Sequence, residues 1–335
     1  MKTLRSAGCT LGALATAAAL AGCSGGAASP AGPASLPLVA QSAVRPGLFR
    51  QATTVHSDHG PSWMAPDAQD ALLYVSDVGT NDVYVYTYPK GKVEGTLTGF
   101  ATPDGLCVDK TGDVFITNFG TQQIFEYAHG GTSAIATLSD AGFYPQGCAI
   151  DPKTGNLAVT NYNNGSGLGN VALYIGAKGN PSAHYTDRNI QQMFLCGYDN
   201  KGNLFVDGEK SNGAFAFAEL PHGSNSFTDI ALNQFINEPG GGVQWNGTSV
   251  AVGDSTTDVI YRFTISGTHG TEVGSTSLDG ASDVVQFSIR GSKVVGPYSP
   301  SVGIWNYPAG GTAIKTLEGG AFNEAIGSAI SVVKR

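Results

Sequence analysis

Eight residues that could bind a ligand lie at the ends of short apolar segments of the sequence. Most of them carry a carboxylate or an amide: Asp77, Asp104, Asn118, Gln146, Asn161, Tyr162, Asp207 and Asp254. Such groups beside aromatic rings can bind a carbohydrate, another small molecule or a protein surface. Asp and Asn also cap turns at strand ends without any ligand. Ligand binding and turn capping are both open interpretations. The choice between them depends on the elements that position these side chains.

A repeated unit contains these residues. The copy over residues 103–138 has four apolar segments separated by turns, and the copy over residues 145–186 repeats it. The second segment recurs six times, at 73–77, 114–118, 157–161, 204–207, 250–254 and 294–297. A period of about 40 to 48 residues suits a four-stranded blade. The sequence therefore predicts an all-β, six-bladed β-propeller of antiparallel blades.

The ends of the chain decide how the ring closes. The first segment of the unit has five internal copies, and a sixth occurs only at residues 326–333. We expect this C-terminal strand to complete the blade that begins at Leu73, because closure leaves no open sheet edge at the seam. Residues 62–66, which include Trp63, are then a leader packed on the outside. In the alternative, they start a seventh, incomplete blade.

The repeat over residues 72–333, with its segment Pro103-Asp104-Gly105-Leu106-Cys107-Val108-Asp109, resembles the NHL-repeat and regucalcin-gluconolactonase propellers. The resemblance implies that a ligand would bind around the central channel, on the face that carries the eight residues. It implies little about activity, because this fold hosts many functions.

The resemblance also offers a metal site to compare. Gluconolactonase-like enzymes hold a divalent metal with a Glu, two Asn and an Asp at the starts of the innermost strands, and only Asp104 matches. The equivalent positions are Gln146, Phe194, Gly240, Ser282 and Ala325. One carboxylate among neutral neighbours is a weak site for such an ion. We therefore expect no metal and no cofactor, and a binding module rather than an enzyme; a metal-dependent lactonase is the alternative.

The N-terminus reads as an export signal. Lys2 and Arg5 precede an apolar stretch over residues 11–21, which is too short to span a membrane. The stretch ends in Leu20-Ala21-Gly22-Cys23, which resembles the lipobox of bacterial lipoproteins. The resemblance implies that residues 1–22 are removed and that Cys23 is lipidated. We expect residues 23–60 to form a flexible tether and residues 61–335 the propeller, anchored by its lipid to the periplasmic or cell-surface side of a membrane.

Charge and cysteine content limit the partners. The chain has a net charge of −8, so a nucleic-acid partner is not expected. We expect a monomer. Cys107, Cys148 and Cys196 lie within apolar segments, and we interpret them as small core residues rather than as a disulfide framework. No nucleophile elbow or phosphate-binding loop occurs in the sequence. Three histidines, His129, His222 and His269, fall in outer hairpins, so histidine catalysis is not expected.

Overall fold

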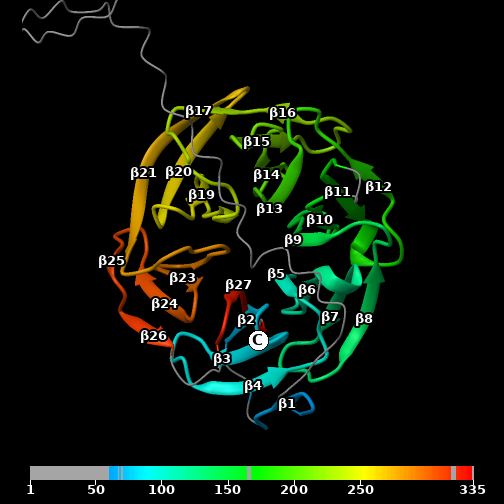
Figure 1. The fold of residues 1–335 in the computed structure, drawn as a ribbon, viewed down its shortest axis with the longest axis vertical. Helices are drawn as coiled ribbons and strands as arrows, with labels where there is room; N and C mark the ends of the chain where they lie inside the picture. The colour runs from blue at the N-terminus through cyan, green and yellow to red at the C-terminus, as the bar shows by residue number, and fades with distance from the viewer. Residues whose placement is uncertain (1–59, 67, 69–70, 164–166, 318–321, 334–335) are drawn as a thin grey trace, which may run out of the picture. The chain divides into compact units, whose positions relative to one another are not determined.

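The computed structural model describes residues 60–66, 68, 71–163, 167–317 and 322–333. Cys23, the expected signal and nearly all of the expected tether lie outside this part of the chain. The described residues form six antiparallel blades around a central channel (Figure 1). Their only helical segments are two short 3-10 turns, Phe119–Thr121 and Ile175–Ala177. The predicted fold class is confirmed.

Each blade has four main strands, which follow one another from the channel outward. Blade 1 contains β27 (Ala325–Ser331), β2 (Leu72–Asp77), β3 (Asp82–Thr87) and β4 (Val93–Leu97). Blade 2 contains β5 (Pro103–Val108), β6 (Val114–Asn118), β7 (Gln123–Tyr127) and β8 (Ala134–Ser139). Blade 3 contains β9 (Pro145–Ile150), β10 (Leu157–Asn161), β11 (Asn170–Tyr174) and β12 (Ala183–Tyr185).

The second half of the ring is less regular. Blade 4 contains β13 (Gln192–Tyr198), β14 (Leu204–Glu209), β15 (Phe215–Leu220) and β16 (Thr228–Asp229). Blade 5 contains β18 (Val243–Trp245), β19 (Val250–Asp254), β20 (Val259–Ser266) and β21 (His269–Asp279). Blade 6 contains β22 (Ser288–Arg290), β23 (Lys293–Tyr298), β24 (Ser301–Asn306) and β26 (Lys315–Leu317). Two short strands, β17 (Ala231–Leu232) and β25 (Gly311–Thr312), pair in parallel with the outer edge of β21.

The second strand of each blade is apolar because blades cover it on both faces. All six residues of β2 are buried, as are all five of β6. The hydrophobic clusters lie between blades rather than within one: Leu72 and Tyr74 of blade 1 pack with Leu106, Val114 and Ile116 of blade 2. Burial between blades therefore holds the ring together.

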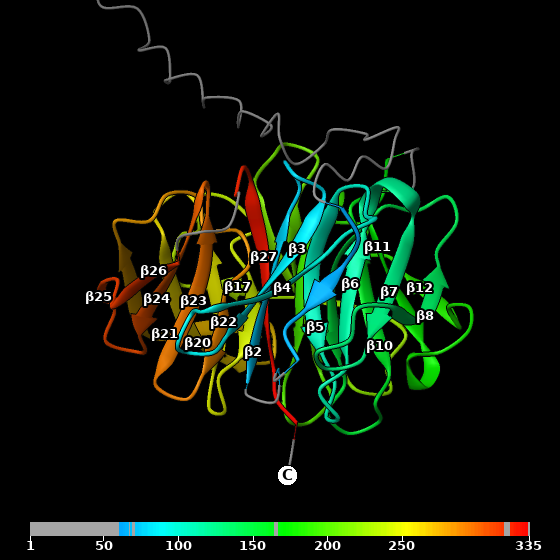
Figure 2. The same ribbon diagram turned by 90° about the horizontal axis from the view of Figure 1, so that it is seen from below.

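The C-terminal strand closes the ring as predicted. Strand β27 pairs antiparallel with β2, from Leu72 opposite Ser331 to Val75 opposite Ser328, and the two strands lie side by side in Figure 2. The leader adds strand β1 (Trp63–Met64) to the outer edge of blade 1, where Trp63 lies opposite Thr96 of β4. The leader is therefore not a seventh blade. No helix among the described residues is long and apolar enough to cross a membrane.

Candidate functional site

Carboxylates at the ends of second strands bind the backbone that leads into the innermost strand of their own blade. Asp77, at the end of β2, accepts hydrogen bonds from the backbone N–H groups of Asn323 at 2.8 Å and Glu324 at 3.1 Å. Asp254, at the end of β19, accepts from the backbone N–H of Asn237 at 3.0 Å. Both side chains are buried. These bonds fix the connections between blades.

Two more of the predicted residues bind backbone in the same way. Asn118 accepts from the N–H of Ala101 at 2.8 Å. Asp207 accepts from the N–H of Leu195 at 2.7 Å and, in the next blade, from that of Gly240 at 2.8 Å. Burial raises the pKa of Asp207 to about 6, although the backbone bonds lower it. Backbone N–H groups therefore already bind side-chain oxygens of Asp77, Asn118, Asp207 and Asp254.

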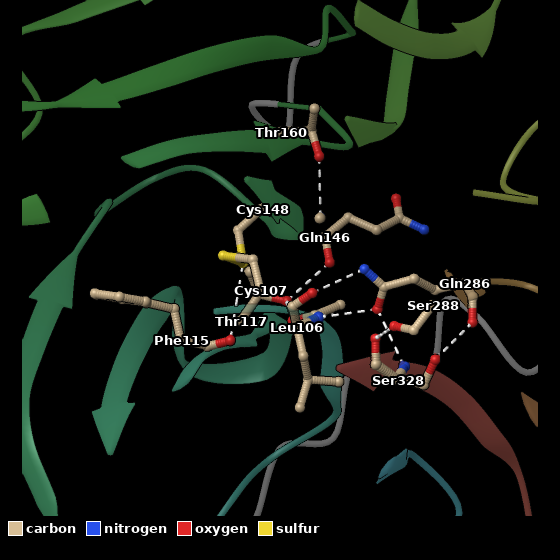
Figure 3. The surroundings of a disulfide bond; sticks show 12 residues. Leu106, Cys107, Phe115, Thr117, Gln146, Cys148, Thr160, Gln286, Ser288 and Ser328 are labelled. Atoms are coloured by element: carbon tan, nitrogen blue, oxygen red, sulfur yellow. Dashed lines mark hydrogen bonds between the residues drawn. A yellow bond between two sulfur atoms is a disulfide. The ribbon is translucent and has the colours of Figure 1, made fainter. Parts of the chain in front are cut away.

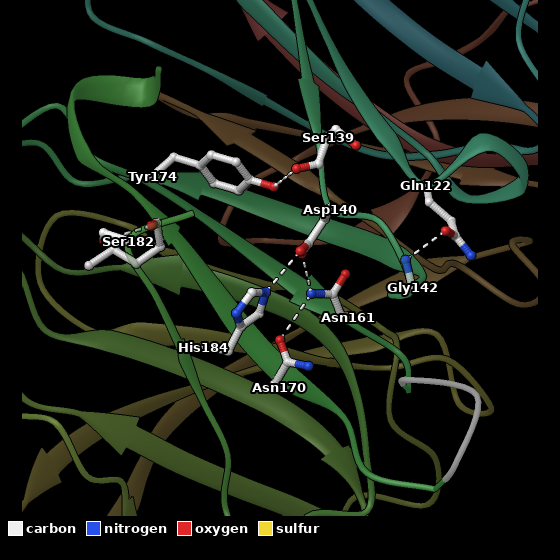
Figure 4. A network of polar contacts seen from close by, with 10 residues as sticks. Gln122, Ser139, Asp140, Gly142, Asn161, Asn170, Tyr174, Ser182 and His184 are labelled. Carbon is white, nitrogen blue, oxygen red and sulfur yellow. Dashed lines mark hydrogen bonds and ion pairs between the residues drawn. The ribbon is translucent and has the colours of Figure 1, made fainter. Parts of the chain in front are cut away.

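Asn161 belongs to a polar network between blades 2 and 3 (Figure 4). Its amide nitrogen donates to the Asp140 carboxylate at 2.7 Å and to the Asn170 side-chain oxygen at 3.0 Å. The other carboxylate oxygen of Asp140 lies 2.8 Å from Nε2 of His184, and the ring of Phe143 stacks on that imidazole with centroids 4.4 Å apart. This network fastens the outer strand β12 to the connection that follows β8.

Side-chain hydroxyls near the ends of second strands position the start of the next innermost strand. Ser76 donates to the backbone oxygen of Asp104 at 2.5 Å. Thr117 donates to that of Gln146 at 2.8 Å. Thr160 makes the equivalent bond to Phe194 in the next blade, at 2.5 Å. Because the three contacts are equivalent, Asp104, Gln146 and Phe194 occupy one level of the channel.

Asp104 and Gln146 are the two predicted site residues at this level, and both keep an unpartnered oxygen. Their side chains are 2% and 1% exposed, yet neither Oδ2 of Asp104 nor Oε1 of Gln146 has a hydrogen-bond partner among the described residues. Burial raises the pKa of Asp104 well above its usual range. The described residues contain no group of three or more His, Cys, Asp or Glu that could hold a metal.

Apolar residues fill the channel near this level. Phe119, Tyr162, Phe194 and Ile326 belong to one buried cluster, which Leu195 and Val285 complete. The rings of Tyr162 and Phe194 form a T-shaped pair with centroids 5.5 Å apart, and burial raises the pKa of Tyr162 to about 12. The aromatic side chain predicted to face a ligand therefore packs against the protein. We call this cluster the channel plug.

A cavity of about 400 Å³ lies at the other end of the channel. All six innermost strands or their continuations contribute to it, together with the turns after β9 and β13. Its side chains include Tyr198, Asp199, Trp245 and Arg290. The sequence did not single out Tyr198, Trp245 or Arg290, because they lie inside the innermost strands rather than at the ends of the second strands.

Two glutamines pair with backbone along the cavity wall. The Gln286 amide donates to the Leu106 oxygen at 2.9 Å and accepts from the Leu106 N–H at 3.0 Å, which connects blade 6 to blade 2 (Figure 3). Gln244 makes the same pair of bonds to Ile289, at 3.1 and 2.7 Å. Innermost strands are the channel-side edges of their sheets, so they present peptide groups that such amides, or a ligand, can bind.

The cavity wall also contains a disulfide. Cys107 of β5 and Cys148 of β9 are bonded (Figure 3), with Cα atoms 5.6 Å apart. Cys196 is free and buried. Our interpretation of the cysteines as unpaired core residues was therefore wrong for Cys107 and Cys148. The sequence places each in an apolar strand but does not show that the two side chains face each other across the interface between blades 2 and 3.

Comparison with known proteins supports the fold alone. No family model and no curated protein matches the sequence. One similar solved structure is a chain from a nidogen/laminin complex, with a TM-score of 0.64 and 13% identity over 79% of this chain and 100% of that one. Another is a protein of unknown function from Bacteroides caccae, with a TM-score of 0.59 and 11% identity over 78% and 99%. At these identities the matches do not identify a function.

Proposed function

We propose that this protein is an exported, lipid-anchored lipoprotein whose NHL-like propeller binds a neutral saccharide in the central cavity and catalyses no reaction. The cavity of about 400 Å³ is the observation that carries the proposal. Its volume lies within the range of small-molecule sites. The lipobox-like Leu20 to Cys23 supports the anchor, and two or more acyl chains would hold the domain at a membrane.

The chemistry of the cavity wall suits a sugar. Trp245 and Tyr198 provide aromatic surface for the apolar face of a pyranose ring. Peptide groups of the innermost strands and the guanidinium group of Arg290 provide donors and acceptors for hydroxyl groups. The channel plug supports binding from this end, because it fills the channel beside Asp104.

Tryptophan fluorescence tests the saccharide proposal. The mature protein in detergent is titrated with glucose, galactose and N-acetylglucosamine and with disaccharides of each. We expect a saturable change for at least one sugar, and at least tenfold weaker binding by calorimetry for Trp245→Leu. Trp63→Phe is the matched control, because Trp63 lies on the outer edge of blade 1. If no sugar binds, or if Trp245→Leu binds as well as the parent, the saccharide proposal fails.

The anchor and the absence of catalysis have separate tests. The parent should partition with detergent-extracted membranes, and Cys23→Ser should not. A parent that stays in the aqueous phase would contradict the lipobox. Metal content and lactone hydrolysis are measured with added calcium, zinc or manganese. Stoichiometric metal together with turnover that Asp104→Ala abolishes would replace the binding proposal with the lactonase alternative.

A further inference from the structure

The outermost strand of blade 4 leaves its blade after two residues. Strand β16 pairs with β15 only at Ala218 and Glu219. One further bond follows, from the N–H of Ile230 to the oxygen of Phe217 at 2.9 Å. The chain then joins blade 5 as β17, whose Ala231 pairs in parallel with β21 (Figure 1). The first half of β15 is thereby left without an outer neighbour among the described strands.

The direction of the backbone groups of β15 follows from this bonding. The oxygen of Phe217 points away from β14, because it accepts from Ile230. Backbone groups two residues apart in a strand point to the same side, so the N–H and C=O of Phe215 also point outward. No described strand pairs with this side of Phe215. An unpaired strand edge of this kind can accept a further strand.

This edge borders a groove of about 1200 Å³ between blades 4 and 5. Its lining includes the half-buried Phe215 and Leu232 and the buried Ile236. Two large apolar side chains at the groove are exposed to solvent, Phe235 at 75% and Leu168 at 46%. Apolar surface beside an open strand edge is typical of a site that binds another chain.

The charge of the groove is opposite to that of the protein. Arg188 and Lys210 line it and are exposed, and neither forms an ion pair with a described residue. Asp229 is its one acidic residue among those described, and its carboxylate already accepts from the side chain of Asn189 at 2.5 Å. The chain as a whole carries a net charge of −8. The two free cations therefore favour a ligand with acidic groups.

We propose that this groove binds an extended peptide segment of a partner protein, in which acidic and apolar residues alternate, and that the segment pairs with the open edge of β15. Alternate side chains of an added strand point to opposite sides. Apolar ones would pack against Phe215 and Phe235, and acidic ones would reach Arg188 and Lys210. A compact small molecule would not pair with the strand edge in this way. The groove is separate from the central cavity, so the peptide proposal does not depend on whether the cavity binds a saccharide.

Synthetic peptides test the proposal. The probe is a fluorescently labelled hexapeptide in which Glu alternates with Val; one comparison peptide has Lys in place of Glu, and another is the acidic peptide N-methylated at alternate amides. Anisotropy with the full mature protein should show saturable binding of the acidic peptide. The other two should bind at least tenfold more weakly, because one has the wrong charge and the other cannot donate to the strand edge. Equal binding of all three, or no saturable binding at millimolar concentration, would overturn the proposal.

Variants locate the site. Arg188→Glu with Lys210→Glu, and separately Phe235→Ser, should each weaken the acidic peptide at least tenfold. The matched control is Lys153→Glu with Lys201→Glu, which reverses two exposed lysines in turns on other parts of the surface and should leave binding unchanged. Sedimentation equilibrium tests the other occupant: self-association that Phe235→Ser abolishes would show that a second copy fills the groove, and the partner-peptide proposal would then be wrong.

Discussion

Cys107 and Cys148 occupy positions that differ by one residue in neighbouring innermost strands. In blade 2, Cys107 lies opposite Phe115 and is one residue before the last pair of the two strands, Val108–Val114. In blade 3, Cys148 lies opposite Val159 and is two residues before the corresponding pair, Ile150–Leu157. Successive side chains of a strand point to opposite faces. The offset therefore turns Cys107 toward blade 3 and Cys148 toward blade 2, and the disulfide joins the blades.

Removing this disulfide should lower the stability of the ring. It closes a segment of 41 residues, for which the chain-entropy model gives about 4 kcal/mol. Cys107→Ala with Cys148→Ala should therefore reduce the free energy of unfolding in urea by an amount of that order. Cys196→Ala is the control: it leaves the disulfide intact and should cost only what a small core cavity costs. Equal losses in the two variants would contradict a cross-linking role.

The same geometry predicts a second cross-link. Ala149 is the blade 3 counterpart of Cys107, because it lies opposite Ala158, one residue from the Ile150–Leu157 pair. Cys196 is likewise the counterpart of Cys148, since it lies opposite Val206. Ala149 and Cys196 also pack in one buried cluster. Ala149→Cys should therefore form a disulfide with Cys196 on oxidation.

Thiol counting checks this cross-link. Under denaturing conditions, the domain from about residue 46 to the C-terminus should show one free thiol in the parent, which is that of Cys196, and none in the oxidised Ala149→Cys variant. The melting temperature of the variant should rise on oxidation and fall back on reduction. Two titratable thiols after oxidation would show that the blade 3 to blade 4 interface does not repeat the geometry of the preceding one.

The blades could be predicted because each carries its own local signals. A buried apolar second strand recurs in all six blades at a period of about 40 to 48 residues, and an Asp-to-Gly turn such as Asp109 to Gly112 precedes it in three of them. The closing strand could be predicted by counting, because only five first strands precede it. Contacts between blades were harder to predict from the sequence, because the alignment of one blade against the next depends on how their side chains pack. That is why the pairing of Cys107 with Cys148 was missed.

The candidate site could be predicted only in part, for a related reason. The sequence shows polar side chains at strand ends, but it does not show whether their partner is a ligand or the backbone of another blade. Asp77 and Asp254 bind backbone N–H groups that are distant in sequence or belong to irregular connections. The lining of the central cavity includes residues such as Leu106 and Ile330, whose types do not distinguish a cavity wall from a core.

Deleting the closing strand should open the ring. Truncation after residue 320 removes β27, which pairs with β2 along its whole length. It also removes the two N–H donors that Asp77 binds at Asn323 and Glu324. We expect the thermal transition of the truncated protein, followed by circular dichroism, to be broader than that of the parent or absent, because the edge of β2 and the interface with blade 6 become exposed. A truncated protein that melts as the parent does would show that β27 does not hold the ring closed.

Asp104→Asn should stabilise the protein at neutral pH. Burial raises the pKa of this carboxyl well above the usual value of 3.8. At pH values well below 3.8 the folded and unfolded states both hold the proton, so the group adds no pH dependence. As the pH rises, the unfolded chain releases the proton while the folded chain keeps it, and the free energy of unfolding falls until the pH reaches the folded pKa. Asparagine has nearly the same shape as aspartic acid and does not titrate. The free energy of unfolding of the variant therefore does not fall with pH for this reason.

Melting temperatures of parent and variant between pH 4 and pH 8 check this expectation: the two should nearly agree at the acidic end, and the advantage of Asp104→Asn should grow as the pH increases. Asp207→Asn is the matched control, because burial also raises the pKa of Asp207, to about 6. There, however, each carboxylate oxygen accepts from a backbone N–H, of Leu195 and of Gly240. The asparagine amide keeps only one acceptor oxygen. Asp207→Asn should therefore lower the free energy of unfolding at neutral pH by about 1–3 kcal/mol. Stabilisation by both substitutions, or by neither, would show that the unpartnered Oδ2 of Asp104 does not distinguish the two sites.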